Sequence, residues 1–192
     1  MSALQLNGAT SGSVTLTPPA VAGTNTLTLP AKTGNIITSA DTGTVTQTML
    51  STNVAGNGPA FAAYQSSSQT ISTVAKIQLQ TKDFDTASCF DSSTNYRFTP
   101  NIAGYYQLTG SIQGGSSSSY IQPYIYKNGS AIKSGTFIAT GTAFQTAQIS
   151  LLVYLNGSTD YVELWASQSV SQALTSGASN GTYFQGFLAR SA

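Results

Sequence analysis

The chain has 192 residues, enough for one domain of about 150 residues and a smaller attached segment. Only 7% of the residues are charged, against a usual ~25%, and the net charge is +1, so no field attracts nucleic acid or an anionic membrane. There is no histidine to act as a general base or metal ligand, and one cysteine, Cys89, excludes an intrachain disulfide. The composition favours a structural or recognition protein over an enzyme, without nucleic-acid binding or membrane insertion.

The N-terminal stretch alternates apolar and polar residues in short bursts. Residues 1–8 lack the basic region and apolar run of a signal peptide, so synthesis in a cytosol is expected. Further along, Val14 and Leu16 alternate with serine and threonine, as do Leu27 and Leu29 with threonine. Such short strands bury little within one chain. They would be more stable against other copies of the chain or docked on another protein.

A change of composition divides the chain at Gly56-Asn-Gly-Pro59. No aromatic residue precedes this turn-forming cluster, and all the aromatic residues follow it, beginning with Phe61. The sequence therefore predicts an N-terminal segment over residues 1–58 and a domain over residues 59–192. Residues 44–55 are compatible with a short helix or a linker.

The second part has the pattern of many antiparallel strands. In the stretch 105–112, alternation puts Tyr106, Leu108, Gly110 and Ile112 on one face. The Asn128-Gly129 and Asn156-Gly157 pairs tolerate positive φ and separate apolar runs, as tight hairpin turns require. Strands at this spacing, with no convincing helical periodicity, predict an all-β sandwich or barrel.

Five segments of this part carry a recognisable pattern, namely Pro59–Tyr64, Phe90–Tyr106 (with Phe98 and Gly104), Tyr124–Gly129, Leu155–Leu164 and Thr182–Leu188. In this order they resemble the strands of C1q-like domains. This resemblance implies a C1q/TNF-like jelly roll of ten strands that assembles as a homotrimer. The expected trimer-interface residues are Phe61, Tyr106, Tyr154 and Phe184.

The stretch from Gly12 to Gly34 resembles segments of bacteriophage tail-fibre and other virion proteins. This resemblance implies a virion protein made in the host cytoplasm. Its N-terminal segment would attach to another virion protein or form a short stalk, with Val14, Leu16, Leu27 and Leu29 as attachment residues. The leading interpretation is a trimeric tail-fibre or receptor-binding tip, and the alternatives are a capsid decoration or head-fibre protein and a glycan-degrading tailspike.

Few residues could carry chemistry or bind a ligand. Asp83 and Asp85 are separated by one residue, so a strand would put both on one face as candidate calcium ligands, although a solvated loop beside Lys82 is the simpler explanation. No other cofactor and no catalytic residue is expected. The loop residues Ser116, Ser117, Ser118, Ser119 and Tyr120 follow Gly114-Gly115 and are the predicted receptor contacts, with a host-surface glycan or protein as partner.

Overall fold

The computed structural model describes residues 4–7, 9–17, 24, 31, 49–50, 56–114, 120–139, 145–174 and 181–192. It divides into two compact units, Met1–Thr44 and Val45–Ala192. The boundary expected after residue 58 falls inside the second unit, directly before its first strand. No helix within the described ranges has the length and hydropathy that a membrane span requires.

The first unit contains a two-stranded antiparallel ribbon. Strand β1 (Leu4–Asn7) pairs with β2 (Ser13–Leu16), and the register sets Leu4 opposite Leu16 and Leu6 opposite Val14. Both leucines of β1 are more than half exposed. An isolated ribbon of two strands is marginally stable in water, so this one is expected to need further packing partners.

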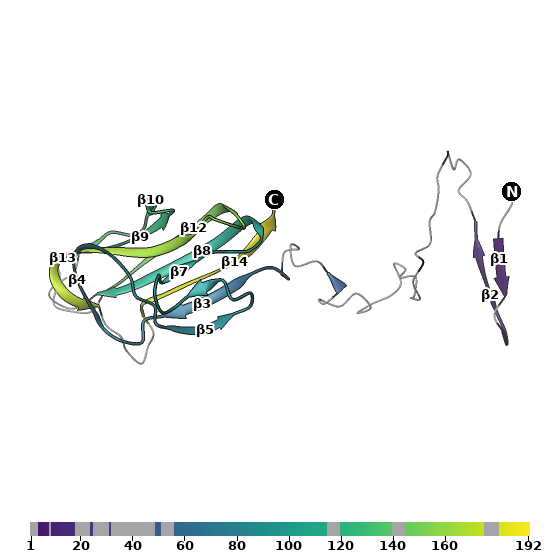
Figure 1. The fold of residues 1–192 in the computed structure, drawn as a ribbon, viewed down its shortest axis with the longest axis horizontal. Helices are drawn as coiled ribbons and strands as arrows, with labels where there is room; N and C mark the ends of the chain where they lie inside the picture. The colour runs from purple at the N-terminus through teal and green to yellow at the C-terminus, as the bar shows by residue number, and fades with distance from the viewer. Residues whose placement is uncertain are drawn as a thin grey trace. The chain divides into compact units, whose positions relative to one another are not determined.

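The second unit is a sandwich of two antiparallel sheets (Figure 1). Strand β8, which is long, lies near the middle of the first sheet and pairs with its neighbours over most of its length. In spatial order, this five-stranded sheet consists of β12 (Gln145–Asn156), β8 (Ala103–Gly114), β14 (Tyr183–Ser191), β3 (Ala60–Tyr64) and β5 (Thr81–Asp85).

The second sheet has seven strands, of which three contain only two residues each. These short strands bring the two sheets to twelve strands, rather than the ten expected. The main path is β10 (Ser130–Ser134), β9 (Tyr120–Lys127), β13 (Val162–Leu174), β7 (Arg97–Phe98) and β6 (Phe90–Asp91); in addition β4 (Gln69–Lys76) pairs with β13, and β11 (Ile138–Ala139) with β9.

The core lies between the sheets and is built from the alternate residues of the long strands. Tyr106, Leu108 and Ile112 of β8 are fully buried, as their predicted common face requires. Phe61 stacks on Phe98 with ring centroids 4.4 Å apart. Burial of these side chains drives the sheets together, at roughly 1.5–3 kcal/mol for each large apolar side chain.

The asparagine–glycine pairs produce two different turns. Asn128 and Gly129 have φ of 52° and 81°, which confirms the tight hairpin between β9 and β10. Between β12 and β13, in contrast, the turn is longer, and the Asn156 Oδ1 accepts hydrogen bonds from the backbone N–H groups of residues 158–160. Gly157 has φ of 70°, and an added Cβ would lie 2.2 Å from the Ala103 nitrogen, so only glycine fits this position.

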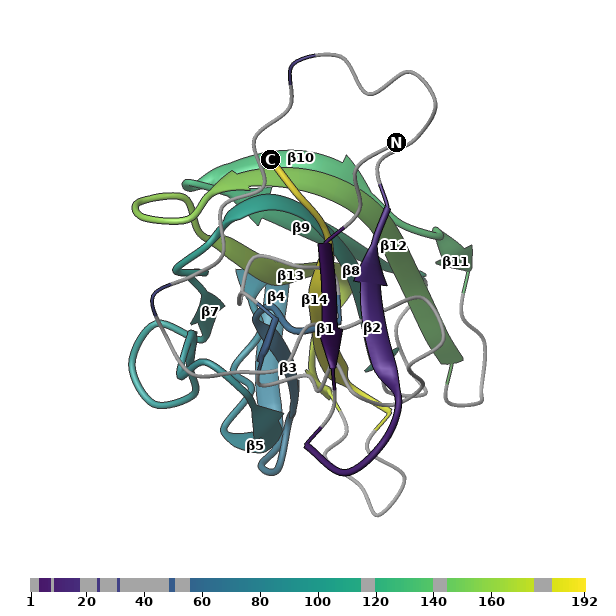
Figure 2. The ribbon, with the colours of Figure 1, turned by 90° about the vertical axis from the view of Figure 1, so that its right-hand side faces the viewer.

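The chain enters and leaves the sandwich at the same end of the sandwich. Strands β3 and β14 are neighbours, and the Leu188 N–H donates a hydrogen bond of 3.0 Å to the Pro59 carbonyl. The backbone N–H of Ala192 lies 3.4 Å from the carbonyl of Ala103. Figure 2 views the sandwich from the end at which β14 finishes.

Candidate functional site

Large apolar side chains gather on the outer face of the five-stranded sheet, which is the face that points away from the second sheet. Leu152 and Phe187 are 57% and 52% exposed, Phe84 is 50% exposed, and Tyr105 and Tyr154 are each 41% exposed. They come from four strands, β5, β8, β12 and β14. A patch of this kind on a monomer usually marks an interaction surface.

Strand alternation explains why these residues face outward. Along β8, the even-numbered residues point into the core, which leaves Tyr105, Gln107 and Thr109 on the outer face. Along the edge strand β12, Ile149 and Leu155 are buried, whereas Leu152 and Tyr154 are exposed. The sheet is therefore apolar on both faces near this edge.

The exposed residues form a continuous ridge across two strands, which we call the β12–β8 ridge and define as Tyr105, Leu152 and Tyr154. The register pairs Tyr154 with Tyr105, and their rings meet edge to face with centroids 5.6 Å apart. Leu152 is paired with Gln107, whose side chain donates a hydrogen bond of 2.8 Å to Ser150. The Gln107 amide beside the ridge therefore has a hydrogen-bond partner within the same chain.

The other half of the same face is hollow, because β3 carries the small residues Ala60 and Ala62 there. A hollow of about 230 Å³ is lined by Ala60, by Phe84 of β5 and by Phe187 of β14. A second hollow of about 220 Å³ continues along β3 beside Ala62 and Tyr64. We call these two hollows together the β3 groove. The face thus combines a protruding apolar half and a recessed half.

The structure corrects three of the four expected interface residues. Phe61, Tyr106 and Phe184 are 0% exposed in a single chain and pack together in the core, so they have no surface to offer a second chain. Tyr154 is exposed and belongs to the ridge. Sequence reasoning did not name the other large apolar residues of this exposed face, Tyr105, Leu152 and Phe187, because alternation alone does not say which face of a strand meets the core.

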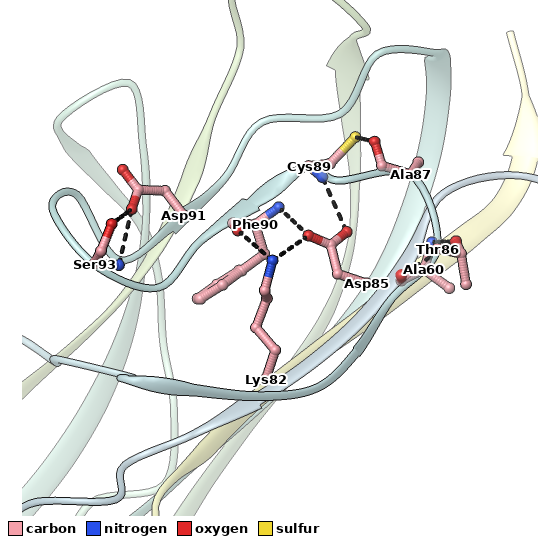
Figure 3. Close-up of polar contacts among 9 residues, drawn as sticks. All are labelled: Ala60, Lys82, Asp85, Thr86, Ala87, Cys89, Phe90, Asp91 and Ser93. Atoms are coloured by element: carbon pink, nitrogen blue, oxygen red, sulfur yellow. Dashed lines mark hydrogen bonds and ion pairs between the residues drawn. The ribbon is translucent and has the colours of Figure 1, made fainter.

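Asp83 and Asp85 both lie in β5, but their surroundings differ. Asp83 is exposed, whereas the Asp85 carboxylate accepts hydrogen bonds from the backbone N–H groups of Cys89 and Phe90 at 2.9 and 3.0 Å and pairs with Lys82 at 3.2 Å (Figure 3). Burial raises the pKa of Asp85, but these donors outweigh burial and leave the pKa below its usual value. Asp85 therefore closes the 85–90 turn.

Within the described ranges, no three His, Cys, Asp or Glu residues lie together as a metal site would need. Calcium binding at Asp83 and Asp85 stays an untested prediction.

The remaining predicted residues lie partly outside the described ranges. The residues that lie outside the described ranges are Ser116–Ser119, Leu27 and Leu29. Tyr120 begins β9 and stacks on Phe137, with ring centroids 5.0 Å apart. Val14 and Leu16 lie in β2, as a strand-forming pattern predicted. Their roles as receptor and attachment residues stay predictions.

The sandwich resembles known jelly rolls of the C1q and TNF kind. Murine APRIL matches with a TM-score of 0.55 at 10% identity, covering 68% of this chain and 98% of that one. The globular domain of zebrafish complement 1qA gives 0.55 at 14% identity, covering 70% and 98%. Eiger TNF from S. frugiperda gives 0.52 at 10% identity, covering 70% and 92%. No family model and no curated protein sequence matches the chain.

At such low identity, this likeness establishes the fold alone. The predicted all-β, C1q/TNF-like jelly roll is confirmed, and it accounts for the second unit. The exposed apolar face is a separate observation on this chain, which the fold by itself does not explain.

Proposed function

We propose that three copies of the chain assemble through the outer face of the five-stranded sheet, with the β12–β8 ridge of each copy seated in the β3 groove of the next. The observation that carries this proposal is the pairing of an apolar ridge and an apolar hollow on one face. This contact would remove Leu152 and Phe187 from water. Their burial contributes roughly 1.5–3 kcal/mol for each side chain.

The position of the ridge and the groove supports a closed ring. They occupy opposite halves of the sheet, so the contact joins two different surfaces of identical chains. A contact of this kind closes into a ring when the rotation between copies is right, and otherwise gives an open filament. The C1q-like sequence pattern favours a ring of three.

The proposed role of the trimer is that of a head domain in a bacteriophage virion protein, acting as a tail-fibre or receptor-binding tip. The virion part rests on the resemblance of residues 12–34 to phage-fibre segments and on the charge-poor composition. In the trimer, three identical heads would bind a host surface with avidity. The N-terminal segment would attach to a neighbouring virion protein.

A capsid decoration or head-fibre protein is the second candidate. The β1–β2 ribbon favours it, because the register pairs Leu4 with Leu16 and Leu6 with Val14 in a structure too small to be stable alone. Such a ribbon suits docking on a shell. Gold labelling of intact virions with an antibody to residues 59–192 separates the two: label at the tail supports the receptor-binding role, and label over the head supports decoration.

Two measurements test the assembly and the non-enzymatic role. Light scattering of the purified full chain should give three times the chain mass, and a monomer at micromolar concentration would contradict the trimer. Incubation with host polysaccharide should leave polymer length unchanged. Depolymerisation would instead support the tailspike alternative, which uses paired carboxylates in a groove.

A further inference from the structure

The outer face of the seven-stranded sheet carries a cluster of aromatic side chains. The rings of Tyr126 and Trp165 stack with centroids 4.4 Å apart and an interplanar angle of 17°. Tyr124 lies directly opposite Trp165 in the register of β9 and β13. Because the neighbouring Ile125 and Leu164 are fully buried in the core, strand alternation places the three aromatic residues on the outer face.

Hydrogen bonds hold this aromatic face in one arrangement. The Trp165 indole N–H donates to Glu163 Oε2 at 2.9 Å, and Lys76 Nζ lies 3.1 Å from Glu163 Oε1. The Tyr124 hydroxyl donates to Gln122 Oε1 at 2.8 Å. Glu163 itself is only 4% exposed. A ligand that binds to side chains already fixed in this way loses little conformational entropy.

The chemistry of the face selects the class of ligand. Lys76 and Glu163 compensate one another, and the register places Arg97 opposite Glu163, so the aromatic cluster has a small net charge and complements an uncharged partner. Aromatic rings pack against the apolar C–H face of a sugar ring, and the amide and hydroxyl groups beside them can bind its hydroxyls. A polyanion would need a basic field, which this chain lacks.

We propose that the face formed by Tyr124, Tyr126 and Trp165, with Gln122 and the Lys76–Glu163 pair, binds an uncharged polysaccharide. This inference rests on the proposed recognition role and names the class of receptor. In the proposed trimer, the five-stranded sheets face each other, so the seven-stranded sheets point outward and their aromatic faces stay accessible.

Trp165 is the only tryptophan of the chain, so its fluorescence reports directly on this face. The full chain would be titrated with dextran, mannan and galactan as uncharged polymers and with alginate as an acidic one. We expect a saturable change in Trp165 emission with at least one uncharged polymer, unaffected by about 0.5 M salt, which screens charge interactions. No change with any uncharged polymer, or binding only to alginate that salt abolishes, would overturn the inference.

Variants then assign the binding to this face. Tyr124→Ser should weaken binding about tenfold or more, equivalent to ~1.4 kcal/mol. Gln122→Ala keeps all three rings and removes the amide that accepts the Tyr124 hydrogen bond, so it should also weaken binding and serves as the test if Tyr124→Ser fails to fold. The matched control is Tyr96→Ser, in the loop before β7, which should bind as the wild type does. Equal affinity in all three variants would contradict the proposed site.

The two proposals can fail separately. Light scattering on the same samples reports assembly independently of fluorescence. A trimer that binds no uncharged polymer overturns only this inference, whereas a monomer that binds one overturns only the proposed trimer.

Discussion

At the scale of single residues, Gln65 is the least expected side chain in the sandwich. It directly follows β3 and is 1% exposed, yet neither its amide nitrogen nor its amide oxygen has a hydrogen-bond partner. Its backbone N–H is satisfied by the carbonyl of Thr182 at 3.0 Å. A buried polar group without a partner costs roughly 1–3 kcal/mol, so this amide, unpaired among the described residues, is expected to lower the stability of the domain.

We therefore expect Gln65→Met, which keeps the shape and removes the amide, to raise the free energy of unfolding by about 1 kcal/mol. The matched control is Gln168→Met, because the buried Gln168 amide donates a hydrogen bond of 2.8 Å to the Ile71 carbonyl. That variant should be destabilised. Denaturant unfolding of both variants measures the difference, and a loss of stability in Gln65→Met would show that its amide has a partner such as an internal water.

At the scale of elements, one carboxylate joins two turns. Asp160 accepts hydrogen bonds from the Asn128 side chain at 2.7 Å and the Asn156 backbone N–H at 3.0 Å, and pairs with Lys127 at 2.8 Å. These contacts, with Lys127 the largest, hold the pKa of Asp160 below its usual value. Asp160 thus links the β9–β10 hairpin to the β12–β13 turn.

This link predicts a dependence of stability on pH. Because the pKa of Asp160 is lower in the folded state than in the unfolded state, its stabilisation is present above pH ~4 and is lost as the pH falls through the folded-state value. The melting temperature should therefore fall on acidification below pH ~4, and less steeply in Asp160→Asn. Identical slopes in the two proteins would refute the link.

The elements also show what the sequence could and could not predict. The buried face of β8 was predictable, because Tyr106, Leu108 and Ile112 alternate and only one arrangement buries all three. The face used in the proposed assembly could not be predicted in this way, because Tyr105 and Tyr106 put an aromatic residue on each side of the strand. Local alternation does not say which side meets the second sheet of the same chain. Tertiary packing decides this, and it placed Tyr106 in the core.

At the scale of the whole molecule, the two sheets have outer faces of different character. The five-stranded sheet exposes aliphatic and aromatic side chains beside a groove, whereas the seven-stranded sheet exposes rings interleaved with hydrogen-bonded polar groups. The first suits contact with an identical chain, and the second suits a hydrated ligand. In the proposed trimer, assembly and recognition would therefore use opposite sides of the head.

Leu152→Lys tests this division of roles. A charge in the β12–β8 ridge would have to be buried in the groove of the neighbouring chain, and we expect each contact to weaken by about 2 kcal/mol or more. The trimer should dissociate at micromolar concentration, as measured by light scattering. Ile132→Lys is the matched control, because Ile132 is 41% exposed on β10 in the other sheet. Dissociation of both variants, or of neither, would count against the ridge.

The chain enters and leaves the sandwich at the same end, and this has a consequence for protein engineering. Pro59 is hydrogen-bonded to Leu188, and residues 101–102 line the same hollow as Gly56 while Ala103 meets Ala192. A short glycine linker could therefore join residue 192 to residue 56, and the ring so formed could be opened at the exposed Asn128-Gly129 turn. The order of strands along the polypeptide would be rotated, while every pairing outside the opened hairpin kept its register. Such a permuted head would carry a fused cargo beside the β9–β10 hairpin.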